Sequence, residues 1–236
     1  MLNKNKIVVT GGSGRFGKLL KTKTNNKFIF PNKKQLDILN LSKVIKYLSK
    51  IKPKCLIHLA GLSRPMIIHE KNISLSIKLN IIGTSNVVIA CEKLGIKLIY
   101  FSTSYVYPET KGNHKECDPL LPVNNYAWSK LGGECAVQMY KNSLILRVSM
   151  TEKPFLHKYA FTNMFTNFIY HDEFINIFLK IINQKGIINI GGPTSSVYNF
   201  AKISNRKIKK KILRNNKIPK MPLKASMNLK KLNSLI

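Results

Sequence analysis

Acidic residues are scarce in this chain of 236 residues: Asp and Glu number 10, against 40 Lys and Arg, which gives a formal net charge of +30. Such an excess attracts polyanions and is typical of nucleic-acid binding. Here the lysines are scattered along the whole chain, and the densest basic run, residues 206–211, lies near the C-terminus. We therefore interpret the charge as compositional and expect no specific nucleic-acid partner, with nucleic-acid binding kept as an alternative. The excess would still help to attract an anionic ligand such as a dinucleotide.

Cysteines and long apolar runs are also few. The four cysteines are Cys55, Cys91, Cys117 and Cys135, and no two of them form a C-x-x-C pair. Cys55 and Cys91 lie in apolar segments, where we expect buried, reduced thiols. The sequence contains no run of about 18 apolar residues, so we expect no membrane span. A strand begins within the first six residues, so we expect no signal peptide. These absences favour a cytoplasmic protein. The histidines and acids show no metal-ligand spacing.

The most informative stretch is a glycine-rich turn. An apolar segment, residues 7–10, runs directly into Gly11, Gly14 and Gly17, where a helix begins. A helix N-terminus carries partial positive charge and suits a pyrophosphate, and glycine lets the phosphate approach the backbone closely. The spacing is G-x-x-G-x-x-G rather than G-x-G-x-x-G. An ordinary turn between a strand and a helix is the alternative.

Strand-like and helix-like segments alternate along the chain. Strands are expected at residues 6–10, 27–30, 55–59, 97–103, 143–148 and 186–190, and helices at 14–21, 42–50, 72–93, 126–140, 172–184 and 196–204. This order predicts an α/β fold with a Rossmann-type, doubly wound parallel sheet. Ser42 is expected to cap the second helix, and Gly95 to end the third. The last thirty residues are basic and poorly patterned.

Two further features place chemistry beside this sheet. Tyr126 and Lys130 are four residues apart on an expected helix, so their side chains share one face. An ammonium near a phenol lowers the phenol pKa from about 10, which makes Tyr126 a credible proton donor or acceptor near neutral pH. Thr103 ends the strand at residues 97–103, and side chains at that end of a parallel strand point toward the ligand crevice. Its hydroxyl is placed to bond a carbonyl oxygen beside the tyrosine.

In this order the features resemble the extended short-chain dehydrogenase/reductases, in particular the branch that modifies sugar nucleotides. Residues 6–149 match well and the rest patchily. The matching segments are Thr10-Gly-Gly-Ser-Gly-Arg-Phe-Gly17, Leu36-Asp37-Ile38, His58-Leu59-Ala60-Gly61, residues 80–86, residues 101–107 and Tyr126-x-x-x-Lys130-x-x-x-Glu134.

The resemblance implies a role for each matching residue. Thr103, Tyr126 and Lys130 would form the catalytic set, in which Thr103 orients a sugar carbonyl and Tyr126 protonates its oxygen. Lys130 would hold the nicotinamide ribose and keep Tyr126 acidic. Cofactor contacts are implied for Gly11, Gly14, Arg15, Phe16, Gly17, Asp37, Leu59, Ala60, Gly61 and Asn80, together with Tyr126 and Lys130. Asp37 is alternatively a turn residue, and Asn80 a helix-packing amide. His58 lies in an apolar strand and is expected to be a packed core residue, not a catalytic one.

Local departures refine the implied reaction. The family's 4,6-dehydratases carry Asp-Glu directly after the catalytic Thr, where this chain has Ser104 and Tyr105, so reduction or epimerisation remains. Lys33 and Lys34 stand where NAD enzymes place a carboxylate on the ribose, which favours NADP, with NAD as the alternative. The resemblance thus implies an NADP-dependent oxidoreductase that reduces a nucleotide-linked 4-keto-sugar in deoxysugar or surface-polysaccharide biosynthesis.

The chain is shorter than is usual for the family, and the shortfall lies after Met150. We therefore expect a dinucleotide-binding domain at residues 1–150 and a reduced substrate-binding lobe at residues 151–236 that packs on the first domain. The alternatives to the reductase are a nucleotide-sugar epimerase with retained NAD(P) and a non-catalytic NAD(P)-binding regulatory subunit. The oligomeric state is open, with a homodimer as one option.

Overall fold

The protein, represented by a computed structural model, is described over residues 6–214 and 218–236. Within these residues the chain forms two compact units. The first lies within Met1–Ser102, Ser129–Ile145 and Gln184–Gly186, and the second within Thr103–Trp128, Leu146–Asn183 and Ile187–Ile236. The predicted division at residue 150 stays a prediction.

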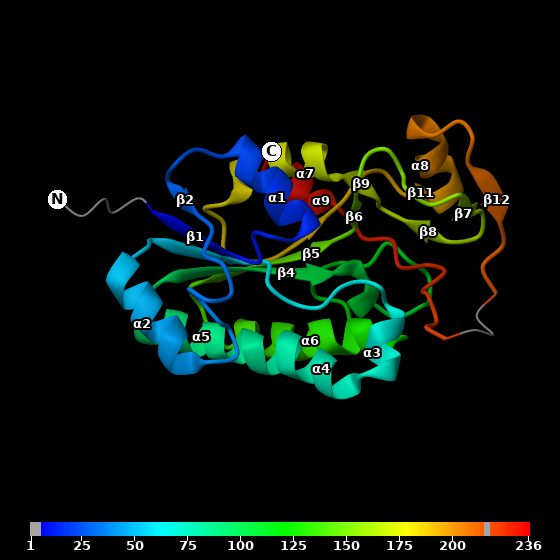
Figure 1. Ribbon diagram of the computed structural model, residues 1–236. Helices are drawn as coiled ribbons and strands as arrows, with labels where there is room; N and C mark the ends of the chain where they lie inside the picture. Colours follow the sequence, from blue (N-terminus) through cyan, green and yellow to red (C-terminus); the bar gives the residue numbers. More distant parts are fainter. Residues whose placement is uncertain (1–5, 215–217) are drawn as a thin grey trace. The chain divides into compact units, whose positions relative to one another are not determined.

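The central sheet has six strands in the order β10-β5-β4-β3-β1-β2 (Figure 1). Their bounds are Ile7–Thr10 (β1), Phe28–Ile29 (β2), Cys55–His58 (β3), Lys97–Thr103 (β4), Ser143–Val148 (β5) and Gly186–Ile190 (β10). β1 pairs in parallel with β2 and β3, and β3 pairs in parallel with β4. All four residues of β3 are buried, as expected of a strand covered on both faces. The predicted Rossmann-type α/β fold is confirmed.

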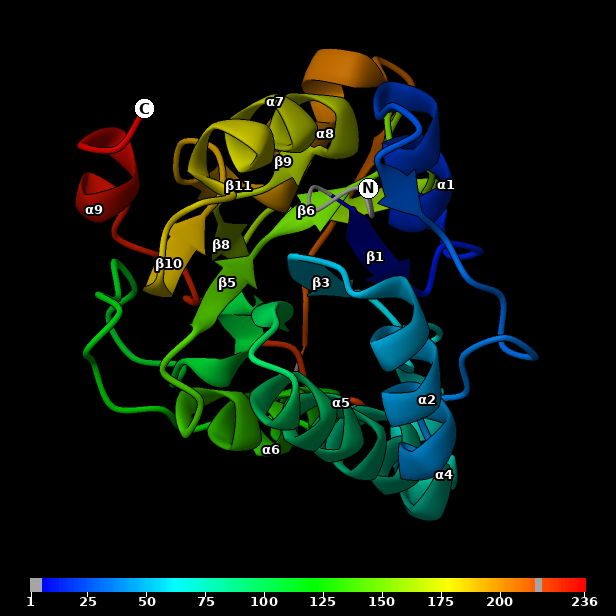
Figure 2. The same ribbon diagram turned by 90° about the vertical axis from the view of Figure 1, so that its left-hand side faces the viewer.

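Helices of the first unit lie on both faces of its strands. Helix α1 (Arg15–Lys23) covers one face, and α2 (Leu41–Ile51) and α5 (Gly83–Lys93) lie side by side on the other (Figures 1 and 2). A short helix, α3 (Ile67–Lys71), precedes the longest helical stretch. Helix α6 (Asn125–Gln138) contributes residues to both units.

The longest helical stretch is continuous but irregular. It consists of α4 (Ile73–Ile77), one π-helical turn η1 (Lys78–Ile82) and α5. The sequence predicted a single regular helix here, and π turns often occur at functional positions. Although the sequence has no unbroken run of about 18 apolar residues, Ile73–Lys93 is long and apolar enough to cross a membrane by length and composition. Its buried residues, among them Val87, Ala90 and Cys91, belong to the core, where α5 contacts α2 and β3. The absence of a membrane span therefore stays a prediction.

The second unit is built from short elements. Its helices are α7 (His171–Ile181), α8 (Val197–Ser204) and α9 (Lys230–Asn233), and a 3-10 turn η2 (Ser104–Val106) follows β4. Three small two-stranded sheets pair β6 (Met150–Thr151) with β9 (Ile169–Tyr170), β7 (Tyr159–Phe161) with β12 (Lys209–Lys211), and β8 (Phe165–Thr166) with β11 (Ser195–Ser196). The C-terminal stretch that lacked a clear pattern therefore contains β12 and α9.

One predicted helix cap is wrong. Asn40, not Ser42, caps α2: its Oδ1 accepts a hydrogen bond of 2.9 Å from the backbone N of Lys43. The helix begins at Leu41, which places Ser42 inside the first turn. Asn and Ser are comparable caps, so the residue adjacent to the helix start took the role. The predicted buried thiols are confirmed, since Cys55 and Cys91 are both buried.

Candidate active site

The turn after β1 leaves no room for a side chain at Gly11 or at Gly17. Gly11 has a φ of +73°, and a Cβ there would lie 2.5 Å from the backbone N of Ala60. A Cβ on Gly17 would lie 2.6 Å from the carbonyl oxygen of Gly11, so α1 packs directly on the turn. Gly14 is the N-cap of α1 and carries no side-chain cap. Backbone donors of the first helical turn are therefore the groups that a pyrophosphate would meet.

The two residues between Gly14 and Gly17 have different surroundings. Arg15, the first residue of α1, is exposed beside the turn. Phe16 is buried, and its ring centroid lies 5.4 Å from that of Phe101 on β4. Of the two, Arg15 is the side chain that could reach a phosphate, whereas Phe16 packs in the core.

A buried hydrogen-bonded chain joins the turn to the loop after β3. Thr10 Oγ1 accepts a hydrogen bond of 3.2 Å from the backbone N of Ala60 and is bonded to His58 Nδ1 at 2.8 Å. The other ring nitrogen of His58 lies 3.1 Å from Thr84 Oγ1. Burial and the nearby Lys130 lower the pKa of His58 to about 3, so its ring is neutral at physiological pH. His58 is a packed core residue, as predicted.

Asn80 holds the loop that contains Leu59, Ala60 and Gly61. Its Oδ1 accepts 2.7 Å from the backbone N of Leu62, and its Nδ2 donates 2.8 Å to the carbonyl of Leu62. The same Nδ2 also lies 2.8 Å from Ser129 Oγ on α6. The π turn η1 sets the position of the Asn80 side chain. The Asn80 amide then holds the predicted cofactor loop through hydrogen bonds to the backbone of Leu62.

Asp37 and the two lysines lie in the segment after β2. Asp37 Oδ1 accepts a hydrogen bond of 3.0 Å from the backbone N of Leu39, which is the geometry of an Asx turn. Lys33 and Lys34 are exposed. Their ammonium groups are therefore accessible to an anionic ligand, as the NADP interpretation requires.

Lys130 lies in the first unit against β4. Its Nζ is 4.1 Å from the centroid of the Tyr100 ring. Burial lowers the pKa of this lysine from 10.5 to about 7, while the carboxylate of Glu134 acts in the opposite direction. Glu134 is fully buried; Ser102 Oγ donates a hydrogen bond to it, and Gln138 Nε2 donates one of 3.1 Å. The lysine thus has a charge state that is sensitive to its neighbours near neutral pH.

Thr103 and Tyr126 lie in the second unit, where Tyr105 contacts both. Thr103 is buried at the end of β4, and its Oγ1 accepts 3.2 Å from the backbone N of Tyr105. The ring of Tyr105 meets that of Tyr126 edge-on, with centroids 6.3 Å apart. Asn124 begins α6 by accepting 2.9 Å from the backbone N of Ala127, which sets Tyr126 in the first turn. Lys130 follows Tyr126 by four residues on the same helix.

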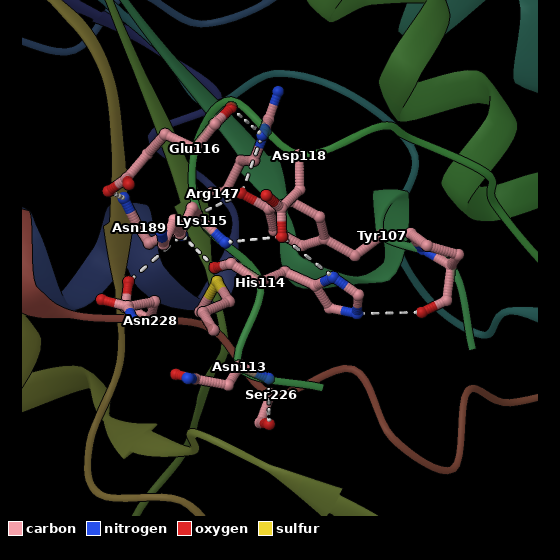
Figure 3. Close-up of polar contacts among 12 residues, drawn as sticks. Tyr107, Asn113, His114, Lys115, Glu116, Asp118, Arg147, Asn189, Ser226 and Asn228 are labelled. Atoms are coloured by element: carbon pink, nitrogen blue, oxygen red, sulfur yellow. Dashed lines mark hydrogen bonds and ion pairs between the residues drawn. The ribbon is translucent and has the colours of Figure 1, made fainter. Parts of the chain in front are cut away.

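A buried polar network supports the second unit (Figure 3). Arg147 on β5 is 1% exposed, and its Nη1 donates 2.7 Å to the hydroxyl of Tyr107 and 2.9 Å to the carbonyl of Glu116. The Tyr107 hydroxyl donates 2.8 Å to Asn189 Oδ1, and the backbone N of Asn189 donates 3.0 Å to Glu116 Oε1. Burial raises the pKa of Tyr107 to about 12, so its hydroxyl remains a donor. The network ties the segment after η2 to β5 and β10.

The same network reaches the C-terminal segment. Asn189 Nδ2 donates 2.9 Å to the carbonyl of His114, and that carbonyl also accepts 2.8 Å from the backbone N of Asn228. The backbone N of His114 donates 3.0 Å to the carbonyl of Ser226. Residues far apart in sequence are thereby held together within the second unit, as Figure 3 shows.

Sequence reasoning missed several of these residues. Arg147 lies in a strand whose other residues are mostly apolar, and a charge in such a strand signals a buried partner. Tyr100 and Tyr107 gave no such signal, because an aromatic residue in or near a strand is typical of core packing. Among the described residues, no group of three or more His, Cys, Asp or Glu could hold a metal ion.

The glycine turn after β1 and the parallel α/β sheet define the class of fold, that of the extended short-chain dehydrogenase/reductases. Comparison with known families gives the more specific assignment: the family model described as RmlD substrate binding domain matches residues 5–176. The chain belongs to this family.

The fold is shared with a solved member of a reductase family. The crystal structure of dTDP-4-dehydrorhamnose reductase from Bacillus anthracis str. Ames in complex with NADP superposes with a TM-score of 0.87 at 24% identity, and the match covers 98% of this chain and 92% of that chain. At this identity the likeness shows the fold alone.

Two curated relatives differ in what they do. Methionine adenosyltransferase 2 subunit beta of Xenopus laevis is 29% identical over 154 residues, which is 61% of this chain and 46% of that protein. GDP-6-deoxy-D-talose 4-dehydrogenase of Aggregatibacter actinomycetemcomitans is 34% identical over 148 residues, which is 58% of this chain and 48% of that protein. The chain spans about half the length of the curated relatives it matches.

Proposed function

We propose that this chain is an NADP-dependent reductase of a nucleotide-linked 4-keto-sugar, of the kind that dTDP-4-dehydrorhamnose reductases represent, acting in deoxysugar or surface-polysaccharide biosynthesis. The observation that carries the proposal is the order of parts along one α/β sheet. A glycine turn shaped for a pyrophosphate ends β1, a buried threonine hydroxyl ends β4, and Tyr126 and Lys130 follow on α6.

The residues of the turn fit a dinucleotide. The Cβ positions of Gly11 and Gly17 are excluded by backbone atoms, and no side chain caps α1 at Gly14. Arg15 stands exposed at the same helix end, and Lys33 and Lys34 offer cations for a 2′-phosphate. The loop of Leu59, Ala60 and Gly61, held by Asn80, would line the bound cofactor. Asp37 and the backbone of Phe16, in the first turn of α1, complete the proposed set. NAD remains the alternative cofactor.

Side chains of this protein would then orient the keto oxygen and transfer a proton to it. When bound, NADPH supplies the hydride that reduces the keto carbon to an alcohol. Thr103 would donate a hydrogen bond to the keto oxygen and orient it. Tyr126 would transfer its phenolic proton to that oxygen, and the ammonium of Lys130 would stabilise the phenolate left behind. Lys130 would also bond the ribose of the cofactor.

A turnover assay tests the proposal. The purified chain would be incubated with NADPH or NADH and a panel of dTDP-, GDP- and UDP-linked 4-keto-sugars, and cofactor absorbance followed. We expect NADPH to be consumed with at least one nucleotide-sugar, in a stoichiometric amount. Product formation without net loss of NADPH would indicate an epimerase instead. No product with any substrate, despite tight cofactor binding, would reject catalysis.

A second candidate function is favoured by one specific observation. Relatives named as a subunit of methionine adenosyltransferase 2 match this chain, one of them over 187 residues at 27% identity. On this alternative the chain binds NAD(P) and serves as a subunit of a larger enzyme. Sedimentation of the chain mixed with a methionine adenosyltransferase, with and without NADPH, would reveal a stable complex if this alternative is correct.

A further inference from the structure

The buried side chain of Tyr100 contacts Lys130 at two places, its ammonium group and its backbone carbonyl. The Lys130 Nζ lies 4.1 Å from the centroid of the Tyr100 ring, a distance at which the ring face attracts a cation. The hydroxyl of Tyr100 donates a hydrogen bond of 2.9 Å to the backbone carbonyl of Lys130. Tyr100 is 1% exposed, so both contacts form in a desolvated environment. The ring therefore sets both where the lysine backbone lies and where its ammonium group points.

Tyr100 is itself held firmly in place. The ring of His58 stacks on it with centroids 6.0 Å apart, and His58 is bonded to Thr10 and Thr84. On the side of α6, a Cβ on Gly133 would lie 2.8 Å from the Tyr100 hydroxyl, so a glycine is needed for this approach. The Tyr100 ring is thus fixed between His58 on β3 and the backbone of α6, and His58 is itself hydrogen-bonded to Thr10 at the end of β1.

The charges around Lys130 come from several elements. Glu134 lies one turn further along α6, and its carboxylate is held by Ser102 on β4 and by Gln138. Burial lowers the pKa of His58 on β3 and that of His69 on α3 below the ordinary value, and the positive charge of Lys130 acts in the same direction on both. Both rings are therefore neutral near pH 7. Within this group Glu134 supplies the negative charge and Tyr100 the aromatic face.

We infer that Tyr100 is a positioning residue that holds the Lys130 ammonium over its ring and favours its charged form, with Glu134 as the second support. The inference rests on the proposed function, because a charged lysine is what makes the phenol of Tyr126 acidic. Burial lowers the pKa of Lys130 to about 7 even though the carboxylate of Glu134 acts in the opposite direction. Loss of the ring would lower it further, and more of the lysine would be neutral at physiological pH.

The first measurement follows the lysine directly, without substrate or cofactor. In protein labelled with ¹³C at the lysine ε-carbon, Lys130 should titrate near pH 7, apart from the exposed lysines, and Lys130→Met assigns its signal. Tyr100→Phe should keep this midpoint, because the ring remains. Tyr100→Leu and Glu134→Gln should each lower it by about one pH unit. A midpoint in Tyr100→Leu equal to that of the wild type overturns the inference.

A graded series of aromatic side chains at position 100 tests the same inference with variants that keep the shape of the ring, so that misfolding does not confuse the result. Phenylalanine at position 100 can be replaced by rings with increasing fluorination, which keep the shape and weaken the negative face. The Lys130 midpoint should fall stepwise along this series, and a constant midpoint contradicts the inference. The matched control is Tyr140→Leu, since the Tyr140 hydroxyl also donates to backbone carbonyls, those of Cys91 and Ile96. This control should leave the midpoint unchanged.

Kinetics separate this inference from the proposed function. If the chain reduces a keto-sugar, the rate of Tyr100→Leu relative to wild type should fall several-fold as the pH rises from 6 to 8, because the remaining ammonium is lost. A merely structural defect would give a loss independent of pH. If no substrate is found, the proposed function fails while the titration still decides the role of Tyr100.

Discussion

Arg147 Nη1 donates a hydrogen bond of 2.7 Å to the hydroxyl of Tyr107, and the guanidinium lies 4.9 Å from the centroid of the same ring. Both side chains are essentially inaccessible to solvent. A guanidinium removed from water is tolerated only where its donors find partners. This pair therefore stabilises the polar network of the second unit. Truncation of the Arg147 side chain should lower the free energy of unfolding.

Replacement of Arg147 by leucine should destabilise the protein by about 3–5 kcal/mol, because it leaves the Tyr107 hydroxyl and the Glu116 carbonyl without their donor. Urea unfolding followed by circular dichroism measures the loss. The matched control is Arg206→Leu, an exposed residue, for which we expect a change within about 0.5 kcal/mol. Equal stabilities of the two variants would mean that the network contributes little.

Replacement of Gly11 by alanine should raise the Kd for NADPH more than about tenfold, since the new Cβ would lie 2.5 Å from the Ala60 backbone N in the turn that would hold the pyrophosphate. Gly95→Ala is the matched control: Gly95 has a φ of +67°, yet among the described residues other than its two chain neighbours no atom lies within 4 Å of its Cβ position. It should cost about 1 kcal/mol of stability from backbone strain alone. Fluorescence titration with NADPH should show normal affinity in this control and weakened affinity in Gly11→Ala.

Replacement of Tyr126 by phenylalanine should lower kcat by a factor of about 10²–10⁴ and leave the Kd for NADPH nearly unchanged, because only the proton donor is removed. Steady-state kinetics on the substrate found by the turnover assay provide the measurement. Tyr198→Phe serves as the control, since Tyr198 also lies near lysines, with Lys210 Nζ 5.4 Å from its ring centroid, but on α8. Full activity in Tyr126→Phe would remove the phenol from the mechanism.

His58 should make the protein less stable in acid. Burial lowers its pKa from 6.5 to about 3 in the folded state, so between these values the unfolded chain binds more protons than the folded one. Stability therefore rises with pH across this window, and the contribution of a neutral His58 is lost progressively as the pH falls from 6.5 toward 3. His58→Gln should flatten this part of the profile. Urea unfolding at pH 4.5 and pH 7 tests it, and an unchanged pH slope in His58→Gln would assign the acid sensitivity to other groups.

The sheet and its helices were predictable in large part from the order of segments. Strands β4, β5 and β10 have the bounds that their largely apolar runs indicated, because the strands of a parallel sheet covered on both faces are rich in apolar residues. The cap of α2 was misplaced by two residues, since Asn40 and Ser42 are comparable caps and only the backbone decides between them. The π turn at Asn80 had no signal, because one additional residue in a helical turn leaves the local pattern nearly unchanged.

By itself the sequence determined the class of fold, the position of the glycine turn and the residue types that could carry a hydride-transfer reaction, because these depend on local pattern and on spacing within single elements. The tertiary structure alone decided what surrounds those residues. It placed the Tyr100 ring under Lys130, the amide of Asn80 on the loop after β3, and Arg147 beside Tyr107. Such contacts join residues that are far apart in the sequence. The pKa of a group likewise depends on its burial and on its neighbours in space rather than on its neighbours in the chain.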